Sequence, residues 1–145
     1  MEESLKLLNE NISEECSAAD QYSPLTLAYL GDAVFELAVR SKLVSHANMQ
    51  VNKLHKQAIN YVSAEAQCAA AEKLLPSFTE KELKIFKRGR NAKPHSMAKN
   101  ATVKAYLEAT GLEAVIGYLY LNREYERLAE LIKAVLEAAD TEETV

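Results

Sequence analysis

LTLAYLGDAVFELAVR, residues Leu25–Arg40, is apolar almost throughout and rich in helix-forming residues, yet it carries Asp32 near its middle. An ionised carboxylate taken out of water costs several kcal/mol unless it is paired, hydrated or bound to a metal. A second run, LEAVIGYLYL from Leu112 to Leu121, has the same pattern with Glu113 as its acid. The two runs predict two core helices that each carry one embedded carboxylate.

Each acid, taken alone, is open to two interpretations. The first is a side chain that is capped by a basic or backbone group, or that points to solvent. In the second, the two helices cross with Asp32 and Glu113 facing each other beside the small residues Gly31 and Gly117. Like charges at close range repel unless a cation lies between them, and Mg²⁺ or Mn²⁺ prefers such hard oxygen ligands. Glu36 shares the helix face of Asp32 and is a ligand, a neighbouring acid or a surface group.

Composition favours an all-helical globular protein. The 145 residues include only four glycines and three prolines. A protein built of β-hairpins needs more of these turn-forming residues. Hydrophobic residues make up 48% and charged residues 26%, as in ordinary globular domains. We therefore expect an all-α fold in one domain over residues 1–145, with residues 1–20 as an N-terminal arm and residues 140–145 as a disordered tail.

Several classes of protein find no support in the sequence. No apolar run reaches the roughly 18 residues of a membrane span, so we expect a cytoplasmic protein with no membrane partner. Cys16 and Cys68 are too few and too far apart for a disulfide framework or a zinc knuckle, and we expect both to be reduced and inert. The chain has no Gly-rich phosphate loop, nucleophile elbow or Cys–His pair, so nucleotide hydrolysis and covalent acyl chemistry are unsupported.

Capping residues and apolar spacing predict the remaining helices. Ser23-Pro24 marks the start of the first core helix, Thr79 caps a short helix that Gly89 closes, and Asn122 is a good N-cap for the last helix. Gly111 marks a bend or a break. The expected helices run over residues 24–44, 51–75, 80–88, from about 102, and from 122.

A basic stretch precedes the second acidic run. Lys81–Lys104 contains eight lysines and arginines and one acid, Glu82, which gives +7 locally in a chain whose total charge is −4. A solvated surface is one interpretation, but this clustering around an irregular loop favours contact with phosphates. The loop has no interleaved aromatic residues, which favours the backbone of a duplex over single-stranded bases. The candidate contact residues are Lys84, Lys87, Arg88, Arg90, Lys93, His95 and Lys99.

Three motifs in this order resemble one family. LGDAVFE in the first core helix resembles the signature helix of the ribonuclease III catalytic domain, and EAVIGYLYL looks like that family's second acidic helix. KRGRNAK, followed by a polar loop, is most similar to the Mini-III branch, which lacks an appended double-stranded-RNA-binding domain. The resemblance spans roughly residues 22–136. Each motif alone is weak evidence, whereas their combination is specific.

The resemblance implies a ribonuclease III endonuclease-domain helical bundle that cleaves double-stranded RNA as a homodimer with Mg²⁺, or with Mn²⁺ as a substitute. By position, Asp32 matches the family's signature aspartate and Glu113 its catalytic glutamate, and both are expected to hold the metal. Cleavage in this family leaves 5′-phosphate and 3′-hydroxyl ends. The family matures precursor 23S ribosomal RNA in bacteria, and the resemblance implies the same substrate for this chain. A ribosomal protein is a further candidate partner.

Two positions depart from the family pattern. Ala28 stands where a glutamate precedes the signature aspartate, and Thr110 stands where an aspartate precedes the catalytic glutamate. Mini-III proteins resemble this chain in their reduced set of acids, so we interpret the change as a property of that branch. The metal count per site, and the roles of Thr110 and Glu36 beside it, stay open. The alternatives are a catalytically silent dimeric module of the same fold that binds RNA or the ribosome, and a helical scaffold for protein interaction.

Overall fold

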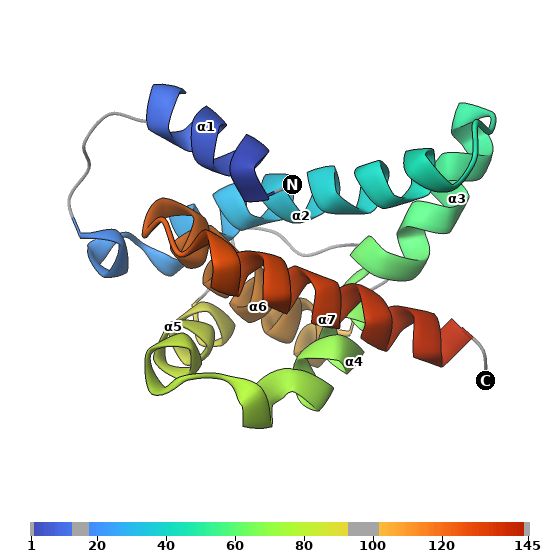
Figure 1. The fold of residues 1–145 in the computed structure, drawn as a ribbon. Coiled ribbons are helices and arrows are strands. Elements are labelled where there is room, and N and C mark those ends of the chain that lie inside the picture. Colours follow the sequence, from blue (N-terminus) through green and yellow to red (C-terminus); the bar gives the residue numbers. More distant parts are fainter. Residues whose placement is uncertain (1, 13–17, 93–101, 144–145) are drawn as a thin grey trace.

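The computed structural model describes residues 2–12, 18–92 and 102–143 (Figure 1). These ranges form seven α-helices and two single 3₁₀ turns, and they contain no β-strand, which confirms the predicted all-α class. The helices are α1 Glu2–Ile12, α2 Pro24–His46, α3 Val51–Val62, α4 Ala64–Leu74, α5 Glu80–Arg90, α6 Val103–Leu121 and α7 Tyr125–Glu143, and the 3₁₀ turns are η1 Ala19–Gln21 and η2 Leu75–Ser77.

Helix α6 is the centre of the fold. It contacts α2, α4, α5 and α7, and in Figure 1 it lies behind α7, between α2 on one side and α4 and α5 on the other. Its residues Leu112, Ile116 and Leu119 are fully buried. One cluster of buried apolar side chains extends from Leu5 on α1 to Ala139 on α7, so the helices share a single core.

Helices α2 and α6 approach each other at two glycines. A Cβ atom added at Gly31 would overlap the backbone carbonyl of Glu113, and one added at Gly117 would overlap the backbone carbonyl of Leu27. Neither overlap can be relieved by a side-chain rotation, because the obstacle is main chain in a packed core. The two backbones therefore touch here only because both positions are glycine.

A second close approach joins α5 to α6 and corrects the prediction for Gly89. This glycine lies inside α5, which continues to Arg90, and does not close the helix. A Cβ atom at Gly89 would lie 2.9 Å from the Cα atom of Gly111, and one at Gly111 would lie 2.8 Å from the carbonyl oxygen of Phe86. Both glycines allow α5 and α6 to pack closely, and α6 continues through Gly111 without a break.

The single long helix predicted from residue 51 to residue 75 is wrong. The structure has two helices, α3 and α4, which meet at Ser63. Ser63 has an extended backbone and its hydroxyl accepts a hydrogen bond from the Ala66 amide, so it caps the start of α4. Apolar spacing does not reveal this break, because both helices bury residues against the same core.

The predicted start of the last helix is also wrong. Asn122 caps the end of α6, and α7 begins at Tyr125. The Glu124 amide donates to the Leu119 carbonyl and the Arg123 amide to the Tyr120 carbonyl, which is the bonding pattern that commonly places a glycine after a helix. Here Arg123 takes that place with a φ of 58°.

Other predicted features are present. Ser23 caps α2, and Thr79 and Glu82 form the reciprocal capping box at the start of α5. Helix α7 extends to Glu143, through part of the segment expected as a tail. No helix in the described ranges combines the length and the apolar character needed to cross a membrane.

We expect Gly31→Ala to destabilise the fold by more than about 3 kcal/mol, because the new methyl group meets a backbone carbonyl. The matched control is Ala33→Gly, an exposed position in the same helix, which should cost only about 0.5–1 kcal/mol. Urea unfolding followed by circular dichroism measures both changes. A Gly31→Ala midpoint equal to that of the unsubstituted protein would contradict the close crossing.

Candidate functional site

The structure brings the two embedded acids together. Asp32 follows Gly31 on α2, and Glu113 lies on α6 at the point where Gly31 touches its backbone. The side chains of Asp32 and Glu113 are hydrogen-bonded to each other. Asp32 is exposed and Glu113 is half-buried. The crossing of α2 and α6 therefore places a pair of carboxyl groups at the edge of the core.

The pair shares a proton when no cation is bound. Burial, the hydrogen bond to Asp32 and the negative charge of Asp32 together raise the pKa of Glu113 to about 9. At neutral pH the Glu113 carboxyl therefore keeps its proton and donates it to Asp32. A divalent cation relieves the same repulsion, since it supplies positive charge between two oxygen ligands. The donor set thus fits a hard divalent ion.

Gln67, on α4, also belongs to this site and was not predicted from the sequence. Its side chain lies close enough to the Glu113 carboxyl to lower the pKa of that group, and the residue is only 2% exposed. One signal was available: Gln67 lies three and four residues before the buried Ala70 and Ala71, so it is a polar residue in an apolar stripe. The undetected break at Ser63 obscured that stripe.

The two residues with no assigned role have other partners. The Glu36 carboxylate accepts a hydrogen bond from Arg40 Nε at 3.0 Å on the next turn of α2. Thr110 is buried, and its hydroxyl donates to the carbonyl of Tyr106 at 2.9 Å. Ala28, at the other position where the family signature has an acid, is also buried. Asp32 and Glu113 are thus the acids that this crossing brings into contact.

Helix α5 presents the basic residues. Lys84, Lys87 and Arg88 are exposed, and Arg90 is half-buried with its guanidinium 5.8 Å from the centre of the Phe86 ring. Three of the predicted contact residues fall outside the described part of the chain: Lys93, His95 and Lys99.

The one acid in the basic stretch is turned inward. Glu82 is 2% exposed, and its two carboxylate oxygens each accept a hydrogen bond of 2.8 Å from the guanidinium of Arg127 on α7. Such two-pronged pairs fix orientation as well as position. Glu82 therefore fastens α5 to the core, and its charge is withdrawn from the outer surface of the basic helix.

The basic helix is also fastened close to the acid pair. Gly89 lies between Arg88 and Arg90 and contacts Gly111, two residues before Glu113. Arg88 additionally donates to the Tyr22 carbonyl, just ahead of α2, at 3.2 Å. The C-terminal end of α5 is thus held beside the helix that carries Glu113.

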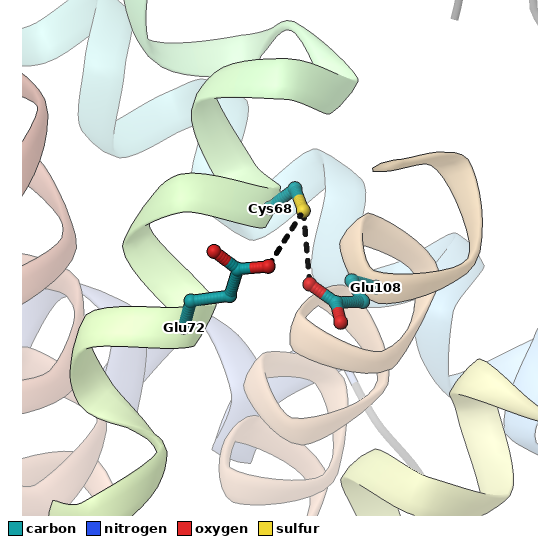
Figure 2. Close-up of side chains that lie close together, drawn as sticks. All are labelled: Cys68, Glu72 and Glu108. Carbon is teal, nitrogen blue, oxygen red and sulfur yellow. Dashed lines mark hydrogen bonds between the residues drawn. The ribbon is translucent and has the colours of Figure 1, made fainter. Parts of the chain in front are cut away.

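A second group of potential metal ligands lies between α4 and α6. Figure 2 shows the Cys68 thiol between Glu72 of the same helix and Glu108 of α6. The thiol donates to Glu108 at 2.9 Å, and Lys104 forms an ion pair of 2.7 Å with Glu72. Burial and the hydrogen bond to Glu108 raise the pKa of the Cys68 thiol to about 12. Because the thiol satisfies Glu108 and Lys104 satisfies Glu72 without a metal ion, we interpret this cluster as a hydrogen-bonded contact between the two helices.

The all-α domain that carries this carboxyl pair matches the family model described as "Ribonuclease III domain" over residues 25–124, which places the chain in the ribonuclease III class. A crystal structure of a Fusobacterium nucleatum protein superposes with a TM-score of 0.73 at 34% identity, covering 81% of this chain and 93% of that one.

Two relatives of known family show which branch of the ribonuclease III class this chain belongs to. The Mini-ribonuclease 3 of Clostridium tetani is 47% identical over 128 residues, covering 86% of this chain and 85% of the relative. That of Symbiobacterium thermophilum is 49% identical over 111 residues, covering 77% of this chain and 85% of the relative. The chain belongs to the Mini-ribonuclease 3 branch of the ribonuclease III family, as the three motifs predicted.

We expect the metal-free protein to lose stability as the pH rises from the ordinary carboxyl range towards 9. Folded Glu113 keeps its proton up to a pKa of about 9, against 4.5 for an unperturbed carboxyl, so the folded state binds more protons than the unfolded state across this window. Urea unfolding in EDTA at about pH 6 and about pH 8 measures the change.

Asp32→Asn is the matched variant for this experiment. It removes the contribution of Asp32 to the pKa of Glu113 and leaves that of burial, so the loss of stability between the two pH values should become smaller. Equal losses in both proteins would contradict the proton-sharing pair.

Proposed function

We propose that this chain is a divalent-metal-dependent endoribonuclease that cleaves double-stranded RNA, with Asp32 and Glu113 holding the ion. Membership of the Mini-ribonuclease 3 family supports the class of activity. The observation that carries the site assignment is the contact between the Asp32 and Glu113 side chains at the crossing of α2 and α6. These are the two acids that the sequence marked as out of place in apolar helices.

Mg²⁺ is the ion that this donor set fits best, with Mn²⁺ as a substitute, because both ligands are carboxylate oxygens. When bound, the ion makes a water molecule a better nucleophile and neutralises charge on the scissile phosphate and the leaving oxygen. The residues of the chain itself contribute by positioning the two ligands. Glu113 is held by its contacts with α2 and α4, and the exposed Asp32 presents its carboxylate at the surface, where a phosphate can reach it. The products have 5′-phosphate and 3′-hydroxyl ends.

The exposed side of α5 binds the phosphates of the RNA backbone in this proposal. Lys84 and Lys87 lie on its surface while Glu82 is turned into the core, so the outer surface of the helix is strongly cationic. Lysine and arginine bind phosphates without reading the base sequence. Lys93, His95 and Lys99 follow α5 in the sequence and lie outside the described residues, and we keep them as candidate phosphate contacts.

The active form that we propose is a homodimer, in which one site cuts each strand of the duplex. The structure leaves large apolar side chains exposed on α2, the helix that carries Asp32: Tyr29 is 83% exposed and Leu37 is 47% exposed. Exposed apolar side chains of this size on one helix fit burial against a second copy. A dimer formed there would hold two acid pairs in a fixed relation.

The substrate that we propose is a duplex segment of precursor 23S ribosomal RNA, with a ribosomal protein as a further candidate partner. This part of the proposal rests on the family resemblance. The competing function is a catalytically silent module that binds duplex RNA. Buried Ala28 and Thr110, which stand where the signature has acids, are the observation in its favour.

We expect Asp32→Asn to abolish cleavage of a duplex RNA hairpin in Mg²⁺ while leaving the affinity for that RNA nearly unchanged. The substitution removes a metal ligand and leaves the basic helix intact. Gel-resolved cleavage and fluorescence anisotropy in EDTA measure the two properties, with Glu10→Gln on α1 as the control for removal of an exposed acid. Cleavage by Asp32→Asn at the unsubstituted rate would refute the site, and an unsubstituted protein that binds without cleaving would establish the silent module.

We expect the double substitution Lys84→Ala and Lys87→Ala to weaken RNA binding and to flatten its dependence on salt. Loss of about two phosphate contacts should lower the slope of log K against log salt by roughly 1.5–2. The matched control is Lys53→Ala with Lys56→Ala, two exposed lysines on α3. If the slope of log K against log salt stays the same in the α5 variant, α5 does not contact the RNA.

A further inference from the structure

Gln67 occupies a place where an amide side chain is costly. It lies in the first turn of α4, is 2% exposed, and sits in line with the buried Ala70 and Ala71. A leucine or methionine would fill the same space without polar atoms to satisfy. The amide is therefore unexplained by packing, which directs attention to its hydrogen bonds.

The orientation of the amide is fixed by its neighbour. Gln67 Nε2 lies 3.1 Å from the carbonyl oxygen of Val62, the last residue of α3. A carbonyl can only accept a hydrogen bond, so the atom facing it is the NH₂ group and not the oxygen. The same side chain interacts with the Glu113 carboxyl, and as a donor it lowers the pKa of that group. The amide thus links Glu113 to the junction of α3 and α4.

The oxygen of the same amide has no partner. Gln67 Oε1 is buried and accepts no hydrogen bond from the protein. A buried acceptor left unpaired costs free energy, and such groups in native proteins call for an explanation in terms of a water, an ion or a function. Because the Gln67 side chain interacts with the Glu113 carboxyl, its unpaired oxygen lies close to the carboxyl pair.

We propose that Gln67 is a positioning residue of the metal site: its NH₂ group orients the Glu113 carboxylate, and its Oε1 accepts a hydrogen bond from a water molecule in the hydration shell of the bound ion. Mg²⁺ held by two carboxylates keeps several waters, and each of those waters is a hydrogen-bond donor. This inference rests on the proposed function, since it requires an ion at Asp32 and Glu113.

The test is binding of Mn²⁺ alone, with no RNA present, measured by calorimetry or by the loss of the free-ion electron paramagnetic resonance signal. Gln67→Met keeps the length and approximate volume of the side chain and removes both the donor and the acceptor. Loss of a group that orients a metal ligand typically weakens metal affinity by 10- to 100-fold. We expect a Kd for Mn²⁺ that is higher by about that factor.

Gln67→Asn provides a second variant that keeps a polar amide at the helix start and withdraws it by one methylene group. This variant keeps the inference testable if Gln67→Met fails to fold. We expect Gln67→Asn also to bind Mn²⁺ more weakly than the unsubstituted protein does. The matched control is Gln57→Met, an exposed glutamine on α3, which should bind as the unsubstituted protein does. Circular dichroism in EDTA establishes that each variant is folded before the titration.

A merely structural role would lower the unfolding temperature and leave the Mn²⁺ affinity of the folded protein unchanged, and that result would overturn the inference. In cleavage assays we expect the Mg²⁺ concentration for half-maximal rate to rise in Gln67→Met, while the rate at saturating Mg²⁺ falls much less.

Asp32→Asn in the same titration separates this inference from the proposed function. If the unsubstituted protein binds Mn²⁺, Asp32→Asn does not, and folded Gln67 variants bind normally, the role of Gln67 alone is refuted. If Asp32→Asn binds as the unsubstituted protein does, or if nothing binds, the metal site fails and the role of Gln67 fails with it.

Discussion

The contact between the backbones of α2 and α6 is the constraint on which the site depends. Gly31 and Gly117 let the two main chains touch, and this contact sets how far apart the side chains on either side of it can lie. Asp32 follows one of these glycines directly, and Glu113 supplies the carbonyl against which it rests. A wider crossing, with a methyl group between the helices, would separate the carboxyl groups. The glycines therefore determine the geometry of a site to which they contribute no side chain.

The same arrangement works against stability. Two carboxyl groups in contact, one of them half-buried, are held together only while a proton or a cation lies between them. The unpaired oxygen of Gln67 adds a further unfavourable group at the same place. Active sites commonly combine such features, because groups arranged for a ligand are not arranged for the empty protein. The well-filled core around Leu112, Ile116 and Leu119 offsets that cost.

The sequence was sufficient to predict the all-α class and the family, and it singled out the two acids that meet at the crossing, because an acid within an apolar helix needs a partner. It was insufficient wherever a single hydrogen bond decided the local structure. The Ser63 hydroxyl divides α3 from α4 while apolar spacing continues across the break. Asn122 has the composition of a helix start, yet Arg123 adopts a left-handed backbone and makes Asn122 the end of α6. Gln67 went unnoticed because the missed break concealed its buried position in the first turn of α4.

The position of the crossing in the chain has a consequence for folding and synthesis. Asp32 and Glu113 are 81 residues apart, so the carboxyl pair forms only when a contact of long sequence separation has closed, which is a slow type of event in folding. A nascent or truncated chain that ends before α6 has one carboxylate and no central helix to pack against. Such fragments cannot assemble the pair, so any activity that depends on the pair requires a nearly complete and fully folded chain.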